Sequence, residues 1–337
     1  MSKLVRNSIF IGLSILFIYF AGDFFGSYRM FLINTIGIYA ILALSYNLIN
    51  GVTGQFSLEP NGFVAVGAYF TAIMLLPTDI KSDMFSLVDP SPIVLSMHTS
   101  SLFLALIVGG IAATIIALVL SFPVFRVRGD YLAIVTLGFG FIIRIFAINN
   151  PQFTNGAIGL NEINSNINFY WVGGALLITF LVMLNIIYSK YGRAMKSVRD
   201  DEDAAVAMGI NTFKMKTLAF ITSAFFEGVG GGLLATLITT ITPDQFSFLL
   251  TFQLLIIVVL GGLGSMSGTL IATILVMVSM EALRFLDEPN ILGLGNEAHP
   301  GLRMVIFSII LILVMLFARR GLLGDRELLD FFKKSKK

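Results

Sequence analysis

The chain is a series of long apolar runs separated by short polar stretches. Apolar runs of roughly membrane-spanning length lie near residues 8–22, 31–49, 62–76, 101–125, 131–149, 169–189, 217–240, 246–260, 267–285 and 302–318. A bilayer core about 30 Å thick needs roughly 20 apolar residues in a helix. The pattern predicts an all-α, polytopic integral membrane protein, with residues 1–337 forming a single transmembrane domain. We expect about ten transmembrane helices, or eight to ten, because the third and eighth runs are short.

Basic residues are enriched on the cytoplasmic side of membranes, so their distribution orients the predicted spans. If the N-terminus is cytoplasmic and every run crosses, the inner segments hold 17 of the 22 Lys and Arg residues. The bias predicts that both termini are cytoplasmic. It also predicts a cytoplasmic loop over residues 190–216 and a cytoplasmic tail over residues 319–337.

Composition supports a membrane protein and excludes several chemistries. Hydrophobic residues make up 56% of the chain and charged residues only 12%, against about 45–50% and about 25% in soluble domains. The first apolar run follows two basic residues, as in a signal peptide, but has no convincing cleavage site, so we interpret it as an uncleaved span. The absence of Cys and the presence of only His98 and His299 disfavour a metal centre or an intramembrane enzyme. The net charge of +2 gives no reason to expect a nucleic-acid partner, whereas membrane lipid is expected around the chain.

The segment "SKYGRAMKSVRDDEDAAVAMGINTFKMK" (189–216) holds ten of the 42 charged residues. We predict that Asp200 caps a short helix that extends to Met208, because its carboxylate can accept the free N–H groups of the first turn. Gly209 would then end the helix in a left-handed conformation. A helix this short is marginal alone in water. Two interpretations remain open: a solvated loop held by basic anchors, or a helix whose small residues, such as Ala207, fit a groove on a cytoplasmic partner.

Several segments resemble one family. "GRAMKSVRDDEDAAVAMGINTFKMKTLAFITSAF" (192–225) looks like the cytoplasmic coupling loop of ABC importer permeases. Further stretches follow the order of the branched-chain amino-acid ABC transporter permease family, LivM type: "LSYNLINGVTGQFSLEPNGFVAVGAY" (44–69), "RVRGDYLAIVTLGFGFIIR" (126–144), "ITPDQFSFLLTFQLLIIVVLGGLGSMSGTLIATIL" (241–275) and "LRMVIFSIILILVMLFARRGLLG" (302–324). The chain therefore resembles this family over most of residues 40–324.

The resemblance implies a permease subunit of an ATP-binding-cassette importer in a bacterial or archaeal plasma (inner) membrane, moving branched-chain or related amino acids into the cytoplasm. It implies a second homologous permease, which can be the same or a different chain, two cytoplasmic ATPase subunits and an extracytoplasmic substrate-binding protein. The chain has no phosphate-binding loop, since "GGLGSMSG" (261–268) lacks the lysine. No cofactor is expected in this chain, and ATP and Mg would bind in the partner ATPases. The residues implied in ATPase coupling are Arg199, Asp200, Asp201, Glu202, Ala204, Ala205, Met208 and Gly209.

The sequence departs from the family pattern at several positions. Relatives usually read "SLGHAAF" where this chain has "SLEPNGF" (57–63), so Glu59 and Pro60 are unusual. Pro60 should break the helix just before the third span, either as a simple span boundary or as a broken helix along the substrate path. Glu227 lies inside the seventh predicted span, where relatives are usually apolar. We predict that it faces a central cavity and pairs with Arg144, or else that it is protonated and packed against other helices.

Two glycine patterns bear on packing. We interpret Gly228, Gly230, Gly231 and Gly232 as sites of close helix packing. The segment "GGLGSMSG" forms either a tight cytoplasmic turn or a re-entrant kink. It shares the spacing G-x-x-G-x-x-S with "GVTGQFS" (51–57), which is too short a match to argue for a duplication.

A cavity for a zwitterion with an aliphatic side chain needs hydroxyl and amide groups and little net charge. The candidate substrate-pathway residues are Asn47, Gln55, Ser57, Asn61, Thr136, Arg144 and Glu227. Two other functions remain open: a permease of the same family for urea, amides or another small polar solute, and a stand-alone ion-coupled transporter with Glu227 as its proton site.

Overall fold

The computed structural model describes residues 26–284, except 86–87, 128, 130 and 164–166, and further residues 305, 306, 308, 309, 312, 316, 321–324 and 327. The described chain is helical, with a single isolated bridge between Leu160 and Ile241. The all-α prediction is therefore confirmed for this part of the chain. The first predicted span (8–22) lies outside the described residues, as does most of the tenth (302–318).

Five helices are long and apolar enough to cross a membrane, and a bent pair of helices makes a sixth candidate. The five are α2 (Ser27–Asn47), which continues as the π-helix η1 (Leu48–Val52), α6 (Leu102–Val124), α7 (Tyr131–Asn149), α9 (Phe169–Tyr188) and α12 (Thr212–Ile238). The bent pair is α3 (Pro60–Leu75) with α4 (Thr78–Met84), which meet at 116°. Two shorter apolar helices, α13 (Phe248–Gly261) and α14 (Met266–Ala282), follow. The chain is thus polytopic, and the count of ten and the inside placement of the termini stay predictions.

The centre of the bundle is formed by α2, α3, α6 and α12, and small residues let these helices approach closely. A Cβ atom added at Gly67 of α3 would lie 2.1 Å from the carbonyl oxygen of Gly228 in α12. A Cβ atom at Gly231 would lie 2.1 Å from the carbonyl oxygen of Val64. Backbones this close leave no room for a side chain, which is how glycine promotes helix association in membranes. The packing role predicted for the glycines of α12 is confirmed.

The helices differ in how much of their surface the chain itself covers. The most apolar windows of α2 and α12 are 72% buried, whereas those of α7 and α9 are 33% and 28% buried. Exposed side chains on α6, α7 and α9 are large and apolar, such as Val119, Ile142 and Ile178. An apolar surface of this kind faces lipid or another membrane protein. Of the five long helices, α2 and α12 are therefore the most buried, and α7 and α9 lie on the flanks.

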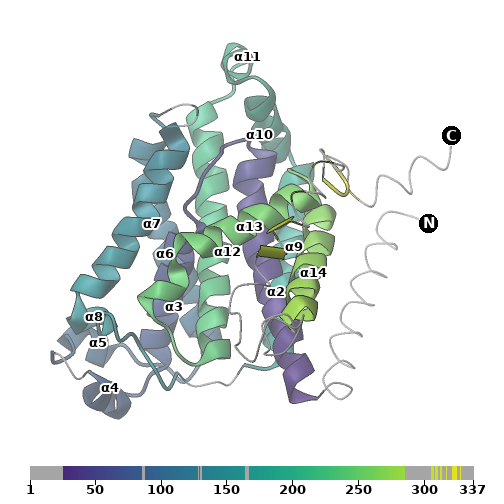
Figure 1. Ribbon diagram of the computed structural model, residues 1–337. Helices are drawn as coiled ribbons and strands as arrows, with labels where there is room; N and C mark the ends of the chain where they lie inside the picture. The colour runs from purple at the N-terminus through teal and green to yellow at the C-terminus, as the bar shows by residue number, and fades with distance from the viewer. Residues whose placement is uncertain are drawn as a thin grey trace.

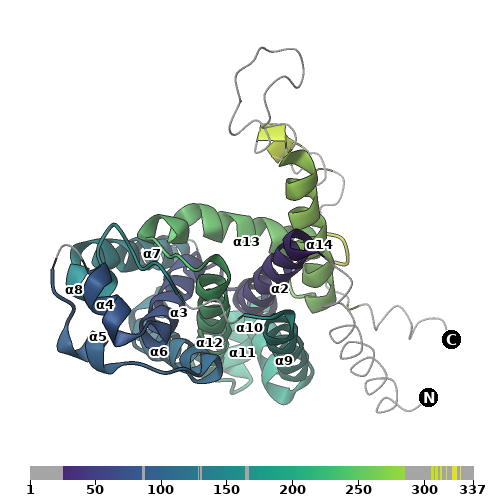
Figure 2. The same cartoon turned by 90° about the horizontal axis from the view of Figure 1, so that it is seen from below.

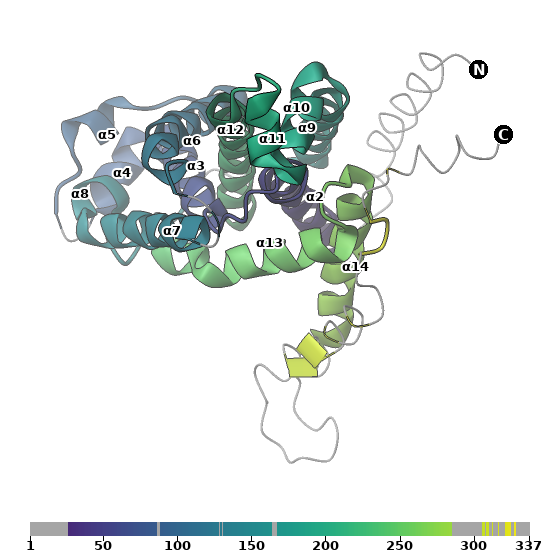
Figure 3. The same cartoon turned by 90° about the horizontal axis from the view of Figure 1, so that it is seen from above.

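Short helices mark the two ends of the bundle (Figure 1). α10 (Lys190–Asp200) and α11 (Glu202–Ala207) lie at one end, and α4, α5 (Pro92–Ser96) and α8 (Pro151–Thr154) lie at the other. Seen along the bundle from either end, α13 runs along one side from α7 to α14 (Figures 2 and 3). The 3₁₀ turn η2 (Pro243–Phe246) connects α12 to α13.

Candidate functional site

The chain is not helical where the second predicted span should give way to the third. η1 ends at Val52, and residues 54–59 have no helical structure before Pro60 begins α3 at its first helical position. The predicted break at Pro60 is confirmed. The 16 residues of α3 rise only about 24 Å, less than the roughly 30 Å of a bilayer core. α3 is therefore a short helix preceded by an irregular stretch of chain, and we call residues 53–59 the break segment.

Side chains from three neighbouring elements satisfy the backbone of the break segment. The N–H group of Ser57 donates to Asn50 Oδ1 at 3.1 Å, and the Ser57 carbonyl accepts from the Tyr46 hydroxyl at 2.6 Å. The N–H group of Leu58 donates to Thr136 Oγ1 of α7 at 2.9 Å. Non-helical backbone inside an apolar bundle is tolerated only where protein groups replace the lost hydrogen bonds. These contacts show how the sequence supports a non-helical segment inside an apolar bundle.

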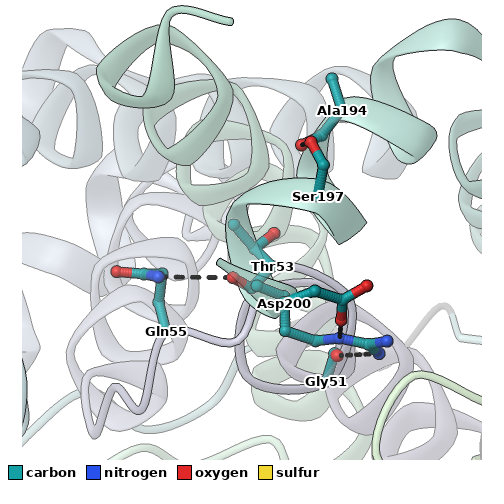
Figure 4. A network of polar contacts seen from close by, with 7 residues as sticks. Gly51, Thr53, Gln55, Ala194, Ser197 and Asp200 are labelled. Atoms are coloured by element: carbon teal, nitrogen blue, oxygen red, sulfur yellow. Dashed lines mark hydrogen bonds and ion pairs between the residues drawn. The ribbon is translucent and has the colours of Figure 1, made fainter. Parts of the chain in front are cut away.

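Three of the predicted pathway residues lie along the break segment and the start of α3. Thr136 of α7 reaches the segment by accepting from the Leu58 N–H, next to Ser57. Asn61, in the first turn of α3, donates from Nδ2 to the Phe246 carbonyl at 3.2 Å, and its backbone N–H donates to Thr251 Oγ1 at 3.3 Å. Gln55 contacts the Thr53 carbonyl at 3.3 Å (Figure 4). The break therefore collects polar side chains from α3, α7 and α13.

Asn47 lies apart from this group and holds the turn between α13 and α14. Its Nδ2 donates to Thr269 Oγ1 at 2.8 Å, and its Oδ1 accepts from the Gly264 N–H at 2.9 Å. Gly262 and Gly264 adopt φ values of 111° and 90°, which other residues rarely adopt. The segment "GGLGSMSG" forms a tight turn between the two short helices α13 and α14, and its cytoplasmic or re-entrant placement stays a prediction. The turn packs against the glycines of "GVTGQFS", since a Cβ atom at Gly51 would lie 2.1 Å from the Gly264 nitrogen.

The predicted pair of Arg144 with Glu227 is wrong. Arg144 of α7 forms an ion pair with Asp244 of η2. Glu227 is fully buried in α12, where Oε1 lies 2.9 Å from the Ser223 hydroxyl. The side chain of Arg144 is one-third exposed on the flank of the bundle, where it pairs with Asp244 in the turn that follows α12. Sequence reasoning missed Asp244, although the polar run "TPDQ" between two apolar runs marks it as a helix connection.

The loop predicted to be cytoplasmic contains two helices where one was predicted. α10 covers Lys190–Asp200, and the short helix is α11 (Glu202–Ala207). The capping residue is Asp201 and not Asp200, because Asp201 Oδ1 accepts from the Ala204 N–H at 2.9 Å and Asp200 is the last residue of α10. The predicted stop at Gly209 is confirmed by its left-handed φ of 81°. The acid run is thus shared between the end of one helix and the start of the next.

The small residues of α11 do not all face outward as a docking surface requires. Ala205 is buried against the protein, whereas Ala204 and Ala207 are exposed. Val206 and Met208 are 53% and 82% exposed. Glu202 joins α11 to α12 through an ion pair with Lys216 at 2.8 Å. Val206 and the C-capping residue Met208 therefore form the exposed apolar tip of α11. Met208 was among the predicted coupling residues, whereas Val206 was missed.

Arg199 connects the cytoplasmic helices to the break segment. Its Nη1 donates to the Gly51 carbonyl at 3.2 Å, and its Nε lies 3.1 Å from Asp200 Oδ1. A Cβ atom added at Gly54 would lie 2.4 Å from Arg199 Cγ. Figure 4 shows Gly51 and Thr53 beside the end of α10, close to Asp200. The arginine therefore packs across the start of the break segment and beside the α13–α14 turn.

The fold and these features define a class: a polytopic helical membrane protein with a broken helix at its centre and a charged helical loop at one end of the bundle. The family described as "Branched-chain amino acid transport system / permease component" matches residues 28–315. The chain belongs to this family, and it is a transport component.

Individual relatives agree with the family. The chain is 31% identical to the high-affinity branched-chain amino acid transport system permease protein LivM of Escherichia coli K12, over 85% of this chain and 68% of the relative. It is 23% identical to the probable LivM of Methanocaldococcus jannaschii, over 87% and 92%. It is 24% identical to LivH of Escherichia coli K12, over 86% and 92%. No solved structure matches the chain.

Proposed function

We propose that this chain is the transmembrane permease subunit of an ATP-binding-cassette importer for branched-chain or related amino acids. The observation that carries the proposal is the family match over residues 28–315, together with relatives named for branched-chain amino acid transport. In this proposal a second homologous permease completes the transmembrane unit, two ATPase subunits bind the cytoplasmic side, and an extracytoplasmic protein delivers the substrate. The complex lies in a bacterial or archaeal plasma membrane.

The exposed tip of α11 is the proposed contact with an ATPase subunit. Met208 is 82% exposed and Val206 53% exposed, on a helix of six residues. So short a helix gains little from its own hydrogen bonds. It is held by the Asp201 cap and the Lys216–Glu202 ion pair. An apolar tip on a fixed helix fits a groove on a partner, as in other helix-in-groove contacts.

Arg199 is the proposed connection between ATPase movement and the membrane. It joins the end of α10, next to α11, to the carbonyl of Gly51, two residues before the break segment. A displacement of α10 and α11 therefore acts directly on Gly51 and on the neighbouring α13–α14 turn. Packed cores respond to such displacements by switching between discrete arrangements. In this proposal Arg199 transmits the movement, Asp201 caps α11, and Val206 and Met208 contact the ATPase subunit.

The polar side chains at the break segment are the proposed lining of the substrate path. Discontinuous helices in transporters expose backbone groups beside the substrate. Ser57, Asn61 and Thr136 supply hydroxyl and amide groups there, as a zwitterionic substrate requires. Gln55 lies at the cytoplasmic end of the same segment. Urea, amides or another small polar solute are alternative substrates for such a lining.

Reconstitution of the complex tests the proposal. The chain would be expressed with its neighbouring transport genes, purified and placed in proteoliposomes with the substrate-loaded binding protein. We expect two ATPase subunits and a second permease to co-purify, and uptake of leucine to require ATP. Uptake that persists without ATP and collapses with the proton gradient would instead establish the stand-alone ion-coupled transporter. Uptake of urea or an amide, but not of leucine, would assign a different substrate.

A further inference from the structure

The structure brings together Glu59 and Glu227, the two acidic residues that the sequence singles out. Glu59 ends the break segment, and Glu227 lies in the middle of α12; both are fully buried. α3 and α12 are in contact just beyond these residues, where the Val64 carbonyl meets Gly231. The hydroxyl of Tyr46 in α2 donates to Ser57, two residues before Glu59, and the neighbouring Ser45 carbonyl accepts from Ser223, one turn before Glu227. α2 therefore brings the two carboxyl groups within electrostatic reach of each other. They form one cluster, which we call the acid pair.

Hydrogen-bond donors are missing around the acid pair. Both carboxyl oxygens of Glu59 and Oε2 of Glu227 are buried and have no hydrogen-bond partner among the described residues. The Tyr46 hydroxyl, the nearest phenol, already directs its proton to the Ser57 carbonyl at 2.6 Å. No basic side chain of the described chain appears among the groups that act on either carboxyl. A buried carboxylate without donors or a cation is strongly destabilised.

The Ser223 hydroxyl shows where a proton must be. Its oxygen lies 2.6 Å from the Ser45 carbonyl and 2.9 Å from Glu227 Oε1. A hydroxyl group carries one hydrogen, and a backbone carbonyl only accepts. When Ser223 donates to the Ser45 carbonyl, the shorter of its two contacts, the contact with Glu227 is a hydrogen bond if the carboxyl group of Glu227 donates. This arrangement favours a protonated Glu227.

We propose that Glu59 and Glu227 form a buried proton-binding site that holds the break segment against α12. The bound proton removes one of two like charges and supplies the missing donor at Glu227. Loss of the proton would leave two buried like charges in one cluster, and their repulsion would separate Glu59, and with it the start of α3, from α12. A divalent cation suits the site less well, because such ions take six or more oxygen ligands. This inference concerns the fold itself and does not depend on the proposed transport function.

Thermal unfolding as a function of pH tests the site in the purified complex. In the unfolded chain both carboxyl groups are already ionised at neutral pH, so the folded state binds more protons and loses stability as the pH rises. We expect the unfolding midpoint of the wild-type protein to fall from mildly acidic to mildly alkaline pH. Glu227→Gln is uncharged and keeps a donor, so it should largely remove this fall. Glu162→Gln, which changes an exposed acid, should keep it.

Infrared difference spectroscopy reads the proton directly and does not depend on stability. The wild-type protein should show the carbonyl band of a protonated carboxylic acid, shifted by deuterium exchange and absent from Glu227→Gln. Absence of that band from the wild-type protein would overturn the proposal. So would an unfolding midpoint that depends on sodium instead of pH, or a Glu59→Gln variant with the same pH dependence as wild type.

Discussion

The break segment and the cytoplasmic helix α11 are both short interruptions of the bundle, yet they are stabilised in opposite ways. The break segment is buried, and its backbone is bound by Asn50, Tyr46 and Thr136 of the same chain. The C-capping residue of α11, Met208, is almost fully exposed to solvent. The break segment is therefore stabilised by contacts within this chain, whereas the exposed apolar tip of α11 is expected to be covered by a partner. Substitutions at the two segments should therefore fail differently, the first by loss of the fold and the second by loss of coupling.

The largest effect is expected from Asn50→Leu. This change removes the acceptor of the Ser57 N–H at a buried position. A buried donor left without a partner costs about 1–3 kcal/mol, so the complex should unfold at a lower temperature and lose uptake with it. Scanning fluorimetry of the purified complex measures the change.

Asn149→Ala is the matched control for Asn50→Leu. The Asn149 amide bonds to the Ile145 carbonyl at an exposed position on α7, where water replaces the lost contact. It should leave stability and uptake near wild type. Equal stability of the Asn50 variant and this control would mean that side-chain contacts do not hold the break segment.

Met208→Glu should abolish uptake without loss of stability. The side chain is 82% exposed, so the permease folds as before, but a charge enters the proposed apolar contact with the ATPase. Uptake and substrate-stimulated ATP hydrolysis should fall at least tenfold, while the unfolding midpoint of the permease stays unchanged. Normal ATP-driven uptake would remove the docking role of this residue. Ala205→Glu does not test docking, because Ala205 is buried and the change would disrupt the loop itself.

Arg199→Ala should weaken the connection between the two regions. It removes the contact of Nη1 with the Gly51 carbonyl and leaves α11 capped. We expect ATP hydrolysis to continue while the number of amino acids imported per ATP falls several-fold. Arg193→Ala, which removes an exposed arginine bonded to Tyr188, is the control. A parallel drop of hydrolysis and uptake in Arg199→Ala would point to a general loss of folding instead of a loss of coupling.

The smallest effect distinguishes Asp201 from Asp200 as the cap of α11. Asp201→Ala removes the acceptor of the Ala204 N–H, and loss of such a cap costs about 0.5–2 kcal/mol of helix stability. Amide hydrogen exchange in residues 202–208 should therefore become faster. Asp200→Ala should leave exchange in these residues near wild type. Faster exchange in Asp200→Ala, with unchanged exchange in Asp201→Ala, would instead identify Asp200 as the cap.

Much of the fold could be read from the apolar runs and the prolines, because both act locally. Pro60 begins α3 as predicted, and Gly209 ends the cytoplasmic loop helix as predicted. The helix cap was predicted one residue too early, because any of several consecutive acids can cap a helix and the local sequence does not distinguish them. Only the position where α10 ends selects Asp201.

The parts that sequence reasoning missed depend on contacts between distant residues. The pairing of Arg144 with Glu227 failed because charge and approximate depth do not show which side of a helix faces the core. Asp244 lies 100 residues from Arg144, and Glu59 meets Glu227 only because α3 and α12 pack through glycine. The family resemblance predicted the class and the loop, and the structure supplied the contacts that connect them.

Site-specific cross-linking from α11 tests the central claim most directly. The chain contains no Cys, so Met208→Cys gives this chain a single thiol. A photoactivatable cross-linker is attached to it before the complex is assembled. We predict cross-links to an ATPase subunit, with a yield that changes when ATP is bound. Ile93→Cys, at an exposed position at the opposite end of the bundle, should give none. Absence of ATPase cross-links from position 208 in a complex that still imports substrate would contradict the claim that α11 docks on the ATPase.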